Sequence, residues 1–591
     1  MSARVEAVTS RVGSSLIKRY SRPTGHLLAS YQHMYVYLYT LAFMTSPMLQ
    51  FFDAEQHIAI VGGGITGLAC AYYITKYYPA AKITIYEKSS RFGGWLLSER
   101  TQVDSDGGTI LFEAGPRSLR PIGNGALSLS MLSDLDLLDD TIWTSRSSPA
   151  ATRRYIYYPD HLVCLLGPPA PGWLADIWKT LTTEPLFEGF LSSVFTEAFR
   201  TSRHEDLTDE SIAQFIGRRL GPKLPERVLS AVFHGIYAGD INRLSAKSLT
   251  KTLWETEGEY GSFMASALLG PFRRPKLPPK RERAFMQALT ELPVIPQHLA
   301  DKIRMSSVFT FRNGLSQFSD GLFGYLYGRP KTNFRHSTTV QSMIKREDGK
   351  IDVATRTESA GKSSGESTST HTHVIWTATP EHLAQYAEDT APISKELSSI
   401  PFESVMTVNL YYSTPDLNPP GFGYLIPLAV PIEQNPENAL GVVFDNSYAP
   451  DPAFDDDDIQ GPAQDTVKKR GTKLTVMLGG HYWRSWPQYP TEEEGLQMAK
   501  SVLRRHLKIT EEPIASRVNF NANCIPQYLV GHETRLNKIH DGLLTEYGGA
   551  LRVAGSWING VGVNDCLRSA WNTVDDLKTT RASGLESIVT P

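Results

Sequence analysis

The chain has 591 residues, too many for one hydrophobic core, so two or three domains are expected. Hydrophobic residues make up 41% and charged residues 20%, as in an ordinary globular protein, and a net charge of −3 leaves no basic excess, which argues against nucleic acid as a partner. The four cysteines have neither disulfide-framework nor zinc-ligand spacing, so we expect reduced thiols and no bound metal.

The first 30 residues carry five basic side chains against one acid, Glu6, and are rich in hydroxyl groups. This composition favours a mitochondrial presequence over an unstructured basic tail, so residues 1–53 are expected to form an N-terminal extension. The apolar stretch MYVYLYTLAFM at 34–44 is shorter than the ~20 residues that a membrane span needs. A transmembrane helix is therefore not favoured.

A dinucleotide-binding unit is predicted next. Residues 58–61 form a short apolar run, GxGxxG follows at Gly62, Gly64 and Gly67, an apolar helical pattern comes after it, and the strand-like KITIYE ends on Glu87. The first glycine permits a tight turn, the second lets the backbone approach a pyrophosphate, and the third lets helix and strand pack closely. The pyrophosphate would lie at the helix N-terminus, and Glu87 would accept hydrogen bonds from the ribose hydroxyls.

The next segment, SSRFGGW, resembles the second glycine motif of the glutathione-reductase-like flavoproteins, in their amine-oxidase-like branch. Where that branch usually has arginine after the glycine pair, Trp95 stands here, and FEAGPRSLRP follows. Further along come FHGIYAGDINRLS, FRNGLSQFSDGL, PGFGYLIP, LGVVFD, LTVMLGG, NCIPQY and RVAGSWINGVGVNDCLRSAW. In this order the motifs resemble the protoporphyrinogen oxidase family, over most of the chain after about residue 55.

The resemblance implies an α/β fold, α+β overall. A glutathione-reductase-like FAD-binding Rossmann domain would be interleaved with a mixed-sheet substrate domain and a helical membrane-docking domain. The expected parts are 54–146, 301–345 and 536–591 for FAD, 147–300 for the helical domain and 346–535 for the substrate domain. Apolar residues at helical spacing from Leu186 to Phe199 predict one helix with a broad apolar stripe, either core or membrane-facing. The segments 355–373 and 450–471 are expected to be solvated loop insertions.

By position, the resemblance carries a set of non-covalent FAD contacts over to this chain. They are Gly62, Gly63, Gly64, Ile65, Thr66, Gly67, Glu87, Lys88, Trp95, Gly115, Pro116, Arg117, Ser118, Val340, Ser556, Val561, Gly562 and Val563. Arg117 is the only charged member of its loop, which makes it either a surface cation or a residue near the flavin.

Protoporphyrinogen is a large, nearly apolar disc with two propionates, so its site needs apolar walls and a cation at the rim. The resemblance places walls at Phe422, Leu425, Val443 and Met477, with Gly423 allowing close approach, and a propionate-pairing cation at Arg154. Without the resemblance, the apolar residues would be read as sheet core and the arginine as a solvated cation.

The implied activity is the six-electron oxidation of protoporphyrinogen IX to protoporphyrin IX, the penultimate step of haem biosynthesis, with dioxygen as acceptor and peroxide as product. Hydride would pass from a ring carbon to FAD in three rounds while ring nitrogens lose protons, and no side chain is assigned as acid or base. The implied location is peripheral, on the mitochondrial inner membrane. A homodimer and hand-off of the product to ferrochelatase are left open.

Three alternatives stay open. An FAD-dependent monoamine or polyamine oxidase shares the fold, although Cys566 in VNDC does not resemble a flavin attachment site. A phytoene-desaturase-like enzyme lacks the GFGYLIP and NCIPQY segments. A non-catalytic escort protein that keeps the fold would purify colourless, whereas a flavoprotein would be yellow.

Overall fold

The computed structural model describes residues 56–103, 108–166, 173–272, 277–290, 297–359, 362–386, 392–450 and 463–589. The chain divides into two compact units, one of residues 1–51 and 284–292, the other of residues 52–283 and 293–591. Of the first unit, only residues 284–290 of helix α13 (Lys280–Thr290) are described. The expected presequence and the apolar stretch at 34–44 lie outside the described residues. The sheets and the candidate site belong to the second unit.

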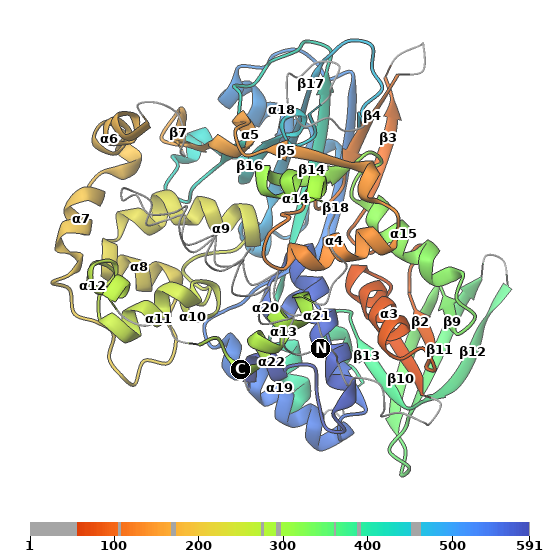
Figure 1. Cartoon of the computed structure of the whole chain (residues 1–591). Coiled ribbons are helices and arrows are strands. Elements are labelled where there is room, and N and C mark those ends of the chain that lie inside the picture. The colour runs from red at the N-terminus through yellow and green to blue at the C-terminus, as the bar shows by residue number, and fades with distance from the viewer. Residues whose placement is uncertain are drawn as a thin grey trace, which may run out of the picture. The chain divides into compact units, whose positions relative to one another are not determined.

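A parallel sheet holds the predicted dinucleotide motif (Figure 1). In the described part of the chain its order is β19-β13-β1-β2-β9, and every neighbouring pair is parallel. The strands are β1 (His57–Val61), β2 (Lys82–Tyr86), β9 (Thr332–Arg335), β13 (His373–Trp376) and β19 (Leu551–Val553). Helix α3 (Ile65–Tyr77) connects β1 to β2, so the predicted strand, glycine turn, helix and second strand are confirmed. The central strands β13, β1 and β2 are buried from their second residue onward because both faces of the sheet are covered.

A second, mixed sheet forms the other main layer. Its order over the described ranges is β18-β14-β17-β16-β15-β6-β7, with β15 and β6 parallel and the other neighbours antiparallel. The strands are β6 (Arg153–Tyr157), β7 (Leu162–Leu166), β14 (Phe402–Tyr412), β15 (Gly423–Leu425), β16 (Ala439–Phe444), β17 (Thr472–Gly479) and β18 (Ala515–Pro526). One face packs against helix α18 (Glu492–Leu507) through side chains such as Val408, Val476 and Val502. The opposite face is free for the site.

Smaller sheets and further helices complete this unit. An antiparallel sheet contains β10 (Thr338–Lys345), β11 (Ile351–Ser359) and β12 (Lys362–His371). Two antiparallel two-stranded sheets join β3 (Ser98–Gln102) to β4 (Thr109–Glu113) and β5 (Thr141–Ser145) to β8 (Ser306–Phe311). Further helices are α4 (Gly125–Asp134), α5 (Pro149–Thr152), α14 (Gln297–Met305), α15 (Ser316–Tyr327), α16 (Pro380–Ala384), α17 (Pro392–Ser398), α19 (His532–Tyr547), α20 (Ser556–Asn559), α21 (Val563–Asp575) and α22 (Glu586–Val589), with short turns η2 (Leu138–Asp140), η6 (Ile432–Gln434), η7 (Asp445–Ser447), η8 (Gly480–Ser485) and η9 (Asp576–Lys578).

Two expected loop insertions differ in the structure. Residues 355–359, 362–371 and 373 lie in β11, β12 and β13, so the loop prediction is wrong for them: alternating Thr and Ser side chains suit an antiparallel pair with polar faces. Of 450–471, residues 451–462 lie outside the described residues, but Gln464 and Asp465 are anchored. Asp465 accepts a hydrogen bond from the Leu111 amide at 2.8 Å and pairs with the buried Lys473 at 2.7 Å. This end of the segment is therefore packed, not solvated.

The expected part boundaries also shift. Strand β13 lies in the parallel sheet, although residues 346–535 were expected to belong to the substrate domain. Strands β6 and β7 belong to the mixed sheet, although 147–300 was expected to be helical. The reason is that strand partners far apart in sequence decide sheet membership, and local patterns do not reveal them.

A helical region follows β7. It contains α6 (Trp173–Thr183), η3 (Pro185–Phe187), α7 (Phe190–Glu197), α8 (Ile212–Leu220), η4 (Pro225–Leu229), α9 (Ser230–Tyr237), α10 (Ala246–Leu249), α11 (Lys251–Tyr260), α12 (Phe263–Leu269) and η5 (Gly270–Phe272). The single helix expected over 186–199 is wrong, because Gly189, with a φ of +78°, breaks it. Leu186 is 1% exposed whereas Phe199 is 89% exposed, so the apolar stripe does not form one face.

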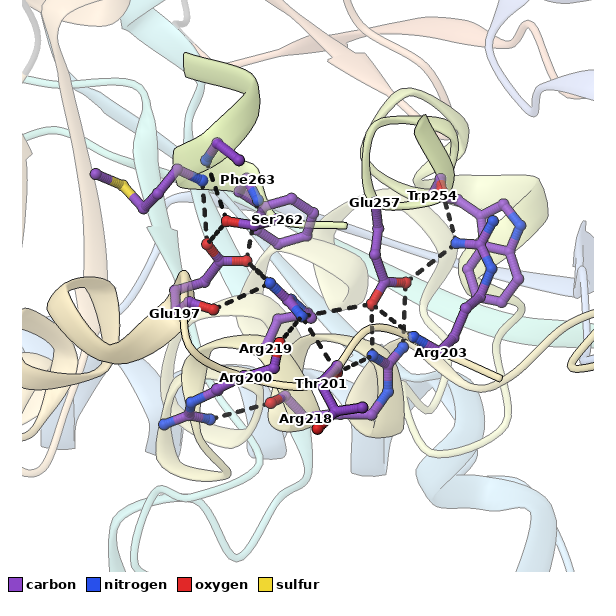
Figure 2. Close-up of polar contacts among 12 residues, drawn as sticks. Glu197, Arg200, Thr201, Arg203, Arg218, Arg219, Trp254, Glu257, Ser262 and Phe263 are labelled. Atoms are coloured by element: carbon purple, nitrogen blue, oxygen red, sulfur yellow. Dashed lines mark hydrogen bonds and ion pairs between the residues drawn. The ribbon is translucent and has the colours of Figure 1, made fainter. Parts of the chain in front are cut away.

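Two buried carboxylates hold this helical region together, as Figure 2 shows. Glu197 accepts hydrogen bonds from Arg219 Nε at 2.8 Å and from the Phe263 and Met264 amides, both at 3.0 Å, which ties the end of α7 to the start of α12. Glu257 pairs with Arg203 and Arg218 at 3.1 and 2.5 Å. Burial alone would raise the pKa of Glu197, but these hydrogen bonds lower it overall. Within the described ranges, no helix is both long and apolar enough to span a bilayer.

Candidate active site

The two glycine motifs lie against each other and form a cradle. The Gly93 amide donates to the Gly63 carbonyl at 2.8 Å, and Gly64 forms a parallel bridge with Gly93. A Cβ on Gly67 would lie 1.9 Å from the Gly62 oxygen, so only glycine lets α3 approach the turn. A Cβ on Gly64, by contrast, would meet only the Gly94 Cα, at 3.8 Å. The backbone at Gly64 is therefore open, as close approach of a pyrophosphate requires.

The carboxylate of Glu87 lies at the carboxyl end of β2, beside this cradle. One oxygen accepts the Gly63 amide at 2.7 Å, and the other accepts the Ser89 amide at 2.8 Å and its hydroxyl at 2.5 Å. These contacts hold the carboxylate next to the first glycine turn. Lys88, the next residue, is exposed.

A second helix N-terminus meets the cradle from the far end of the chain. The first turns of α3 and α21 touch through Thr66 and Cys566, and burial raises the pKa of the Cys566 thiol to about 11 against a smaller opposing hydrogen bond from Thr66. Asn564 donates to the Arg120 carbonyl at 2.9 Å, which joins α21 to the loop that contains Gly115 to Ser118. Two helix N-termini and a glycine turn thus converge, an arrangement that favours phosphate groups.

Tyr528 fixes the segment that leads into α21. Its hydroxyl donates to the Ser556 carbonyl and accepts the Gly560 amide at 2.7 Å, so it fastens both ends of α20. The ring of His532 stacks on it at 4.3 Å. Val561 to Val563 follow directly and begin α21. The position of these predicted residues therefore depends on one buried tyrosine.

The Arg117 side chain is largely buried, and only some of its hydrogen-bond donors have a partner among the described residues. Its Nε donates to Asp445 Oδ1 at 3.1 Å, with 11% and 3% of the two side chains exposed. Asp445 Oδ2 accepts the Thr475 hydroxyl at 2.5 Å, and Thr475 accepts from Asn409 at 2.7 Å. The Nη2 atom of Arg117 is buried and has no hydrogen-bond partner among the described residues. A buried unpaired donor of this kind is costly unless a ligand atom meets it.

Five of the expected substrate residues lie on one face of the mixed sheet, and the sixth, Phe422, packs against the cluster that contains Val443 and Met477. Gly423 pairs with Val443, Leu425 with Gly441, and Gly441 with Met477, and paired or alternate residues share a face. Ile156 pairs with Leu425 in the parallel β6–β15 ladder, which puts Arg154, two residues before it, on the same face. This is the face opposite α18.

The same sheet face carries the FAD loop. Thr407, paired with Met477, donates to the Ala114 carbonyl at 2.8 Å, and Asn409, paired with Thr475, donates to the Glu113 carbonyl at 3.1 Å. The loop from Gly115 to Ser118 continues directly from these carbonyls. The structure thus brings the expected cofactor and substrate residues together across one sheet face.

Arg154 lies at the rim of this face. Its guanidinium carbon is 5.8 Å from the centre of the Phe422 ring, a cation–π distance. Burial and the neighbouring Arg120 lower the pKa of Arg154, yet an arginine stays protonated at neutral pH. Phe422, Leu425 and Met477 are half-buried, unlike the closed side chains on the α18 face. The face therefore offers apolar walls and a cation, the two features that an apolar dicarboxylate needs.

The remaining predicted residues have simpler positions. Trp95 is 49% exposed, so it is no core aromatic, and Gly115 packs against its main chain. Val340 is buried in the core of the parallel sheet, and its carbonyl accepts from Tyr386 at 2.6 Å. Pro116 is exposed, Ile65 and Ser118 are half-buried, and Gly562 is exposed at the start of α21.

Sequence reasoning missed Asp445 and Tyr528. Both were inside quoted motifs, Asp445 as the last letter of LGVVFD and Tyr528 as the last of NCIPQY. The signal for Asp445 is an acid directly after an apolar strand. Its partner in the GPR triplet is more than 300 residues earlier in the chain, so the pair is visible only in the fold.

The described residues fit FAD. The open backbone at Gly64, the Glu87 carboxylate beside it and the unpartnered Nη2 of Arg117 supply the space, the acceptor and the donor that a dinucleotide flavin requires. Gly62 to Gly67 and the start of α21 would hold the pyrophosphate, and the loop with Arg117 would face the reactive ring.

Comparison with known proteins identifies the family. The family model described as flavin containing amine oxidoreductase matches residues 65–578. A protoporphyrinogen oxidase from Schizosaccharomyces pombe is 33% identical over 526 residues, 88% of this chain and 98% of that protein. The one from Homo sapiens is 30% identical over 528 residues, 87% of this chain and 96% of that protein.

Solved structures agree on the fold. A crystal structure from Exiguobacterium sp. superposes with a TM-score of 0.64 at 20% identity, covering 89% of this chain and 99% of that one. Cyclohexylamine oxidase from Brevibacterium oxydans gives 0.53 at 14% identity, covering 89% and 100%. The chain belongs to the flavin-containing amine oxidoreductases and, among them, to the protoporphyrinogen oxidase family.

Proposed function

We propose that the protein oxidises protoporphyrinogen IX to protoporphyrin IX with bound FAD and dioxygen as the final acceptor. The observation that carries the proposal is the single sheet face on which apolar walls, a rim arginine and the FAD loop meet. The chemistry that FAD supplies when bound is two-electron acceptance. Removal of six hydrogens from the porphyrinogen then corresponds to three such rounds and three molecules of peroxide.

The chain's own residues bind and orient the substrate. The guanidinium of Arg154 would pair with a propionate at the rim, where its planar fork can make two hydrogen bonds. Phe422, Leu425, Val443 and Met477 would cover the macrocycle and exclude water. A Cβ at Gly423 would lie 2.3 Å from the Val442 carbonyl, so glycine is required for β15 to lie this close to β16.

Two substrates offered separately test the function. Purified protein should be yellow, bleach under anaerobic protoporphyrinogen IX and regain its colour in air. Porphyrin fluorescence and peroxide should both rise with protoporphyrinogen and not with benzylamine, which reports amine oxidation. Porphyrin formation no faster than autoxidation in buffer would reject the proposal.

Neighbouring arginines test the substrate pose. Arg154→Ala should raise KM by roughly 10-fold and change kcat little, because a propionate contact is made equally in ground and transition states. Arg153→Ala is the matched control, since Arg153 is the adjacent residue on β6 and points to the other face. Equal kinetics of the two variants would remove the propionate role from Arg154.

We also propose that the helical region docks on the mitochondrial inner membrane. Helices α6, α7 and α12 lie along one edge of it (Figure 1), and large apolar side chains on and beside them are exposed. They are Leu174, Trp178, Phe195, Phe199, Leu268, Leu269 and Phe272. Apolar side chains in the headgroup zone attach a protein in the membrane plane without a span. The homodimer and the transfer of product to ferrochelatase stay predictions.

A further inference from the structure

Two histidines meet beside helix α9, which packs against the proposed substrate face. His234 lies on α9 and His481 on η8, and their Nε2 atoms are 2.9 Å apart. Gly235, next to His234, packs against Leu425, and the His481 amide donates at 2.8 Å to the carbonyl of Ala238, which packs against Met477. His234 is 2% exposed, whereas His481 is partly exposed. Of the two imidazoles, only His481 has exposed surface.

The hydrogen bonds fix the tautomer of both rings. His234 Nδ1 is 2.7 Å from the Ile426 carbonyl, which can only accept, so Nδ1 carries the hydrogen. Its Nε2 is then an acceptor in the neutral ring, and the hydrogen shared with His481 belongs to His481 Nε2. His481 Nδ1 is left with a lone pair, and no described residue hydrogen-bonds to it. The pair therefore presents one basic nitrogen on its exposed member.

The surroundings keep both rings neutral. Burial, and for His481 also its partner ring, lowers the pKa of His234 to about 4 and that of His481 to about 3. Asp240 opposes this shift in both rings, Arg484 adds to it at His481, and Tyr482 packs on the His481 ring at 4.1 Å. At neutral pH the lone pair on His481 Nδ1 is therefore available to take a proton.

We propose that His481 accepts the proton that a pyrrole N–H of protoporphyrinogen loses on oxidation, and that His234 holds it in the tautomer that can do so. The inference rests on the proposed function. In each round a ring C–H bond breaks with both electrons leaving as hydride to FAD, and a ring N–H bond breaks with its electron pair returning to the macrocycle. The proton forms a bond to His481 Nδ1 and then passes to water.

Acid–base strength is consistent with this role. Hydride loss leaves a cation conjugated with the pyrrole nitrogen, whose N–H is far more acidic than that of a neutral pyrrole, so a weak base suffices. The imidazolium formed at His481 keeps its Nε2–H bond to His234, which strengthens once the donor is charged. Asp240 offsets part of the cost that burial puts on that charge. His234 is thus a positioning residue, and His481 the one that meets the reacting atom.

An isosteric variant separates chemistry from packing. His481→Gln places an amide N–H near the old Nε2, so it keeps the bond to His234 but has no basic nitrogen. We expect kcat to fall by about 100-fold, the usual scale for losing a proton acceptor, with KM and FAD content near those of wild type. Wild-type turnover in this variant would overturn the inference. Failure of the wild type itself to exceed autoxidation would instead reject the proposed function.

Chemical rescue and the second histidine give independent readouts. In His481→Ala, added imidazole should restore turnover, more strongly at about pH 8 than at about pH 6, because unperturbed imidazole groups deprotonate near pH 6.5. His234→Asn keeps a donor for the Ile426 carbonyl but removes the acceptor for His481. It should lower kcat by roughly 10-fold and leave KM unchanged. A purely structural pair would show no imidazole rescue, and that result would overturn the proposal.

Discussion

At the scale of single residues, the site depends on polar groups that are buried before any ligand binds. Arg117 is held by Asp445, which is held in turn by Thr475, so the direction of the guanidinium is set by a chain of hydrogen bonds across the sheet. Preorganisation of this kind lowers the cost of ordering a donor at the moment of binding. The same hydrogen bonds make the buried Arg117–Asp445 pair sensitive to the loss of either partner.

Removing the charge of Asp445 tests how much the buried Arg117–Asp445 pair contributes to stability. Asp445→Asn should lower the free energy of unfolding by about 3 kcal/mol, because it leaves the Arg117 guanidinium buried without its counter-ion. Urea unfolding of the FAD-loaded protein measures the change. Asp575→Asn is the control: its pair with Lys578 is 30–50% exposed, so a loss of less than about 1 kcal/mol is expected. Similar losses in both variants would contradict the account.

Glu113 gives a prediction about pH. Burial raises its pKa to about 8, although Ser98, the Leu315 amide, Arg117 and Lys473 pull it down. A carboxyl group whose pKa is raised on folding contributes stability that is complete below its unfolded pKa of about 4.5 and is lost as pH rises to about 8. Glu113→Gln should therefore flatten the decline in Tm between about pH 5 and pH 8.5. A decline as steep as that of wild type would show that Glu113 titrates normally.

Single residues also mark the limit of sequence reasoning. The motif around Arg117 indicated a role near the flavin but not its partner, because Asp445 lies in η7, more than 300 residues later in the chain. The tautomers of His234 and His481 depend on the Ile426 carbonyl, a main-chain atom that no side-chain pattern reveals.

At the scale of elements, the glycines of the cradle divide into two kinds. Gly67 is required for folding, since a Cβ there would strike the Gly62 oxygen at 1.9 Å. Gly64 is not required for folding, since its φ of −73° suits any residue and its Cβ would meet nothing nearer than 3.8 Å, so we expect its role to be close approach of the ligand. The same motif therefore serves two different physical purposes.

Two alanine variants separate these purposes. Gly64→Ala should leave the unfolding of the FAD-free protein unchanged and weaken FAD binding by at least about 10-fold, because the new methyl group occupies the path of the pyrophosphate. Gly67→Ala should lower the stability of the FAD-free protein itself, because α3 must move away from β1. Calorimetry without FAD and flavin titration measure the two effects. Equal FAD affinity of Gly64→Ala and wild type would place the cofactor elsewhere.

Elements were predicted well where their signal is local. The βαβ unit was recognised from glycine spacing and strand patterns, which lie within about 30 residues of one another. The sequence of β12 predicts a loop because its Ser and Thr side chains give no hydrophobic strand pattern. In the structure, pairing with β11 stabilises it as a strand. The break at Gly189 was missed because apolar spacing continued across it.

At the scale of the whole second unit, the helical region combines a rigid interior with an apolar exterior. Glu197 is 0% exposed and joins α7 to α12. The elements that it connects carry exposed apolar side chains: Phe195 and Phe199 on or beside α7, and Leu268 and Leu269 on α12. Exposed apolar side chains gathered on fixed helices are typical of a surface that meets another apolar phase. The interior ion pairs thus fix where the apolar side chains stand.

One exposed phenylalanine tests the membrane proposal directly. Phe199→Ser should weaken binding to phosphatidylcholine–cardiolipin vesicles by about 10-fold, since a Phe side chain buried from water contributes roughly 1.5–3 kcal/mol. Tyr327→Ser on α15 is the control, because Tyr327 is 70% exposed but lies outside the helical region. Vesicle flotation with FAD-loaded protein measures both variants. Equal loss of binding in the two variants, or no loss in either, would show that the exposed apolar side chains of the helical region do not hold the protein to lipid.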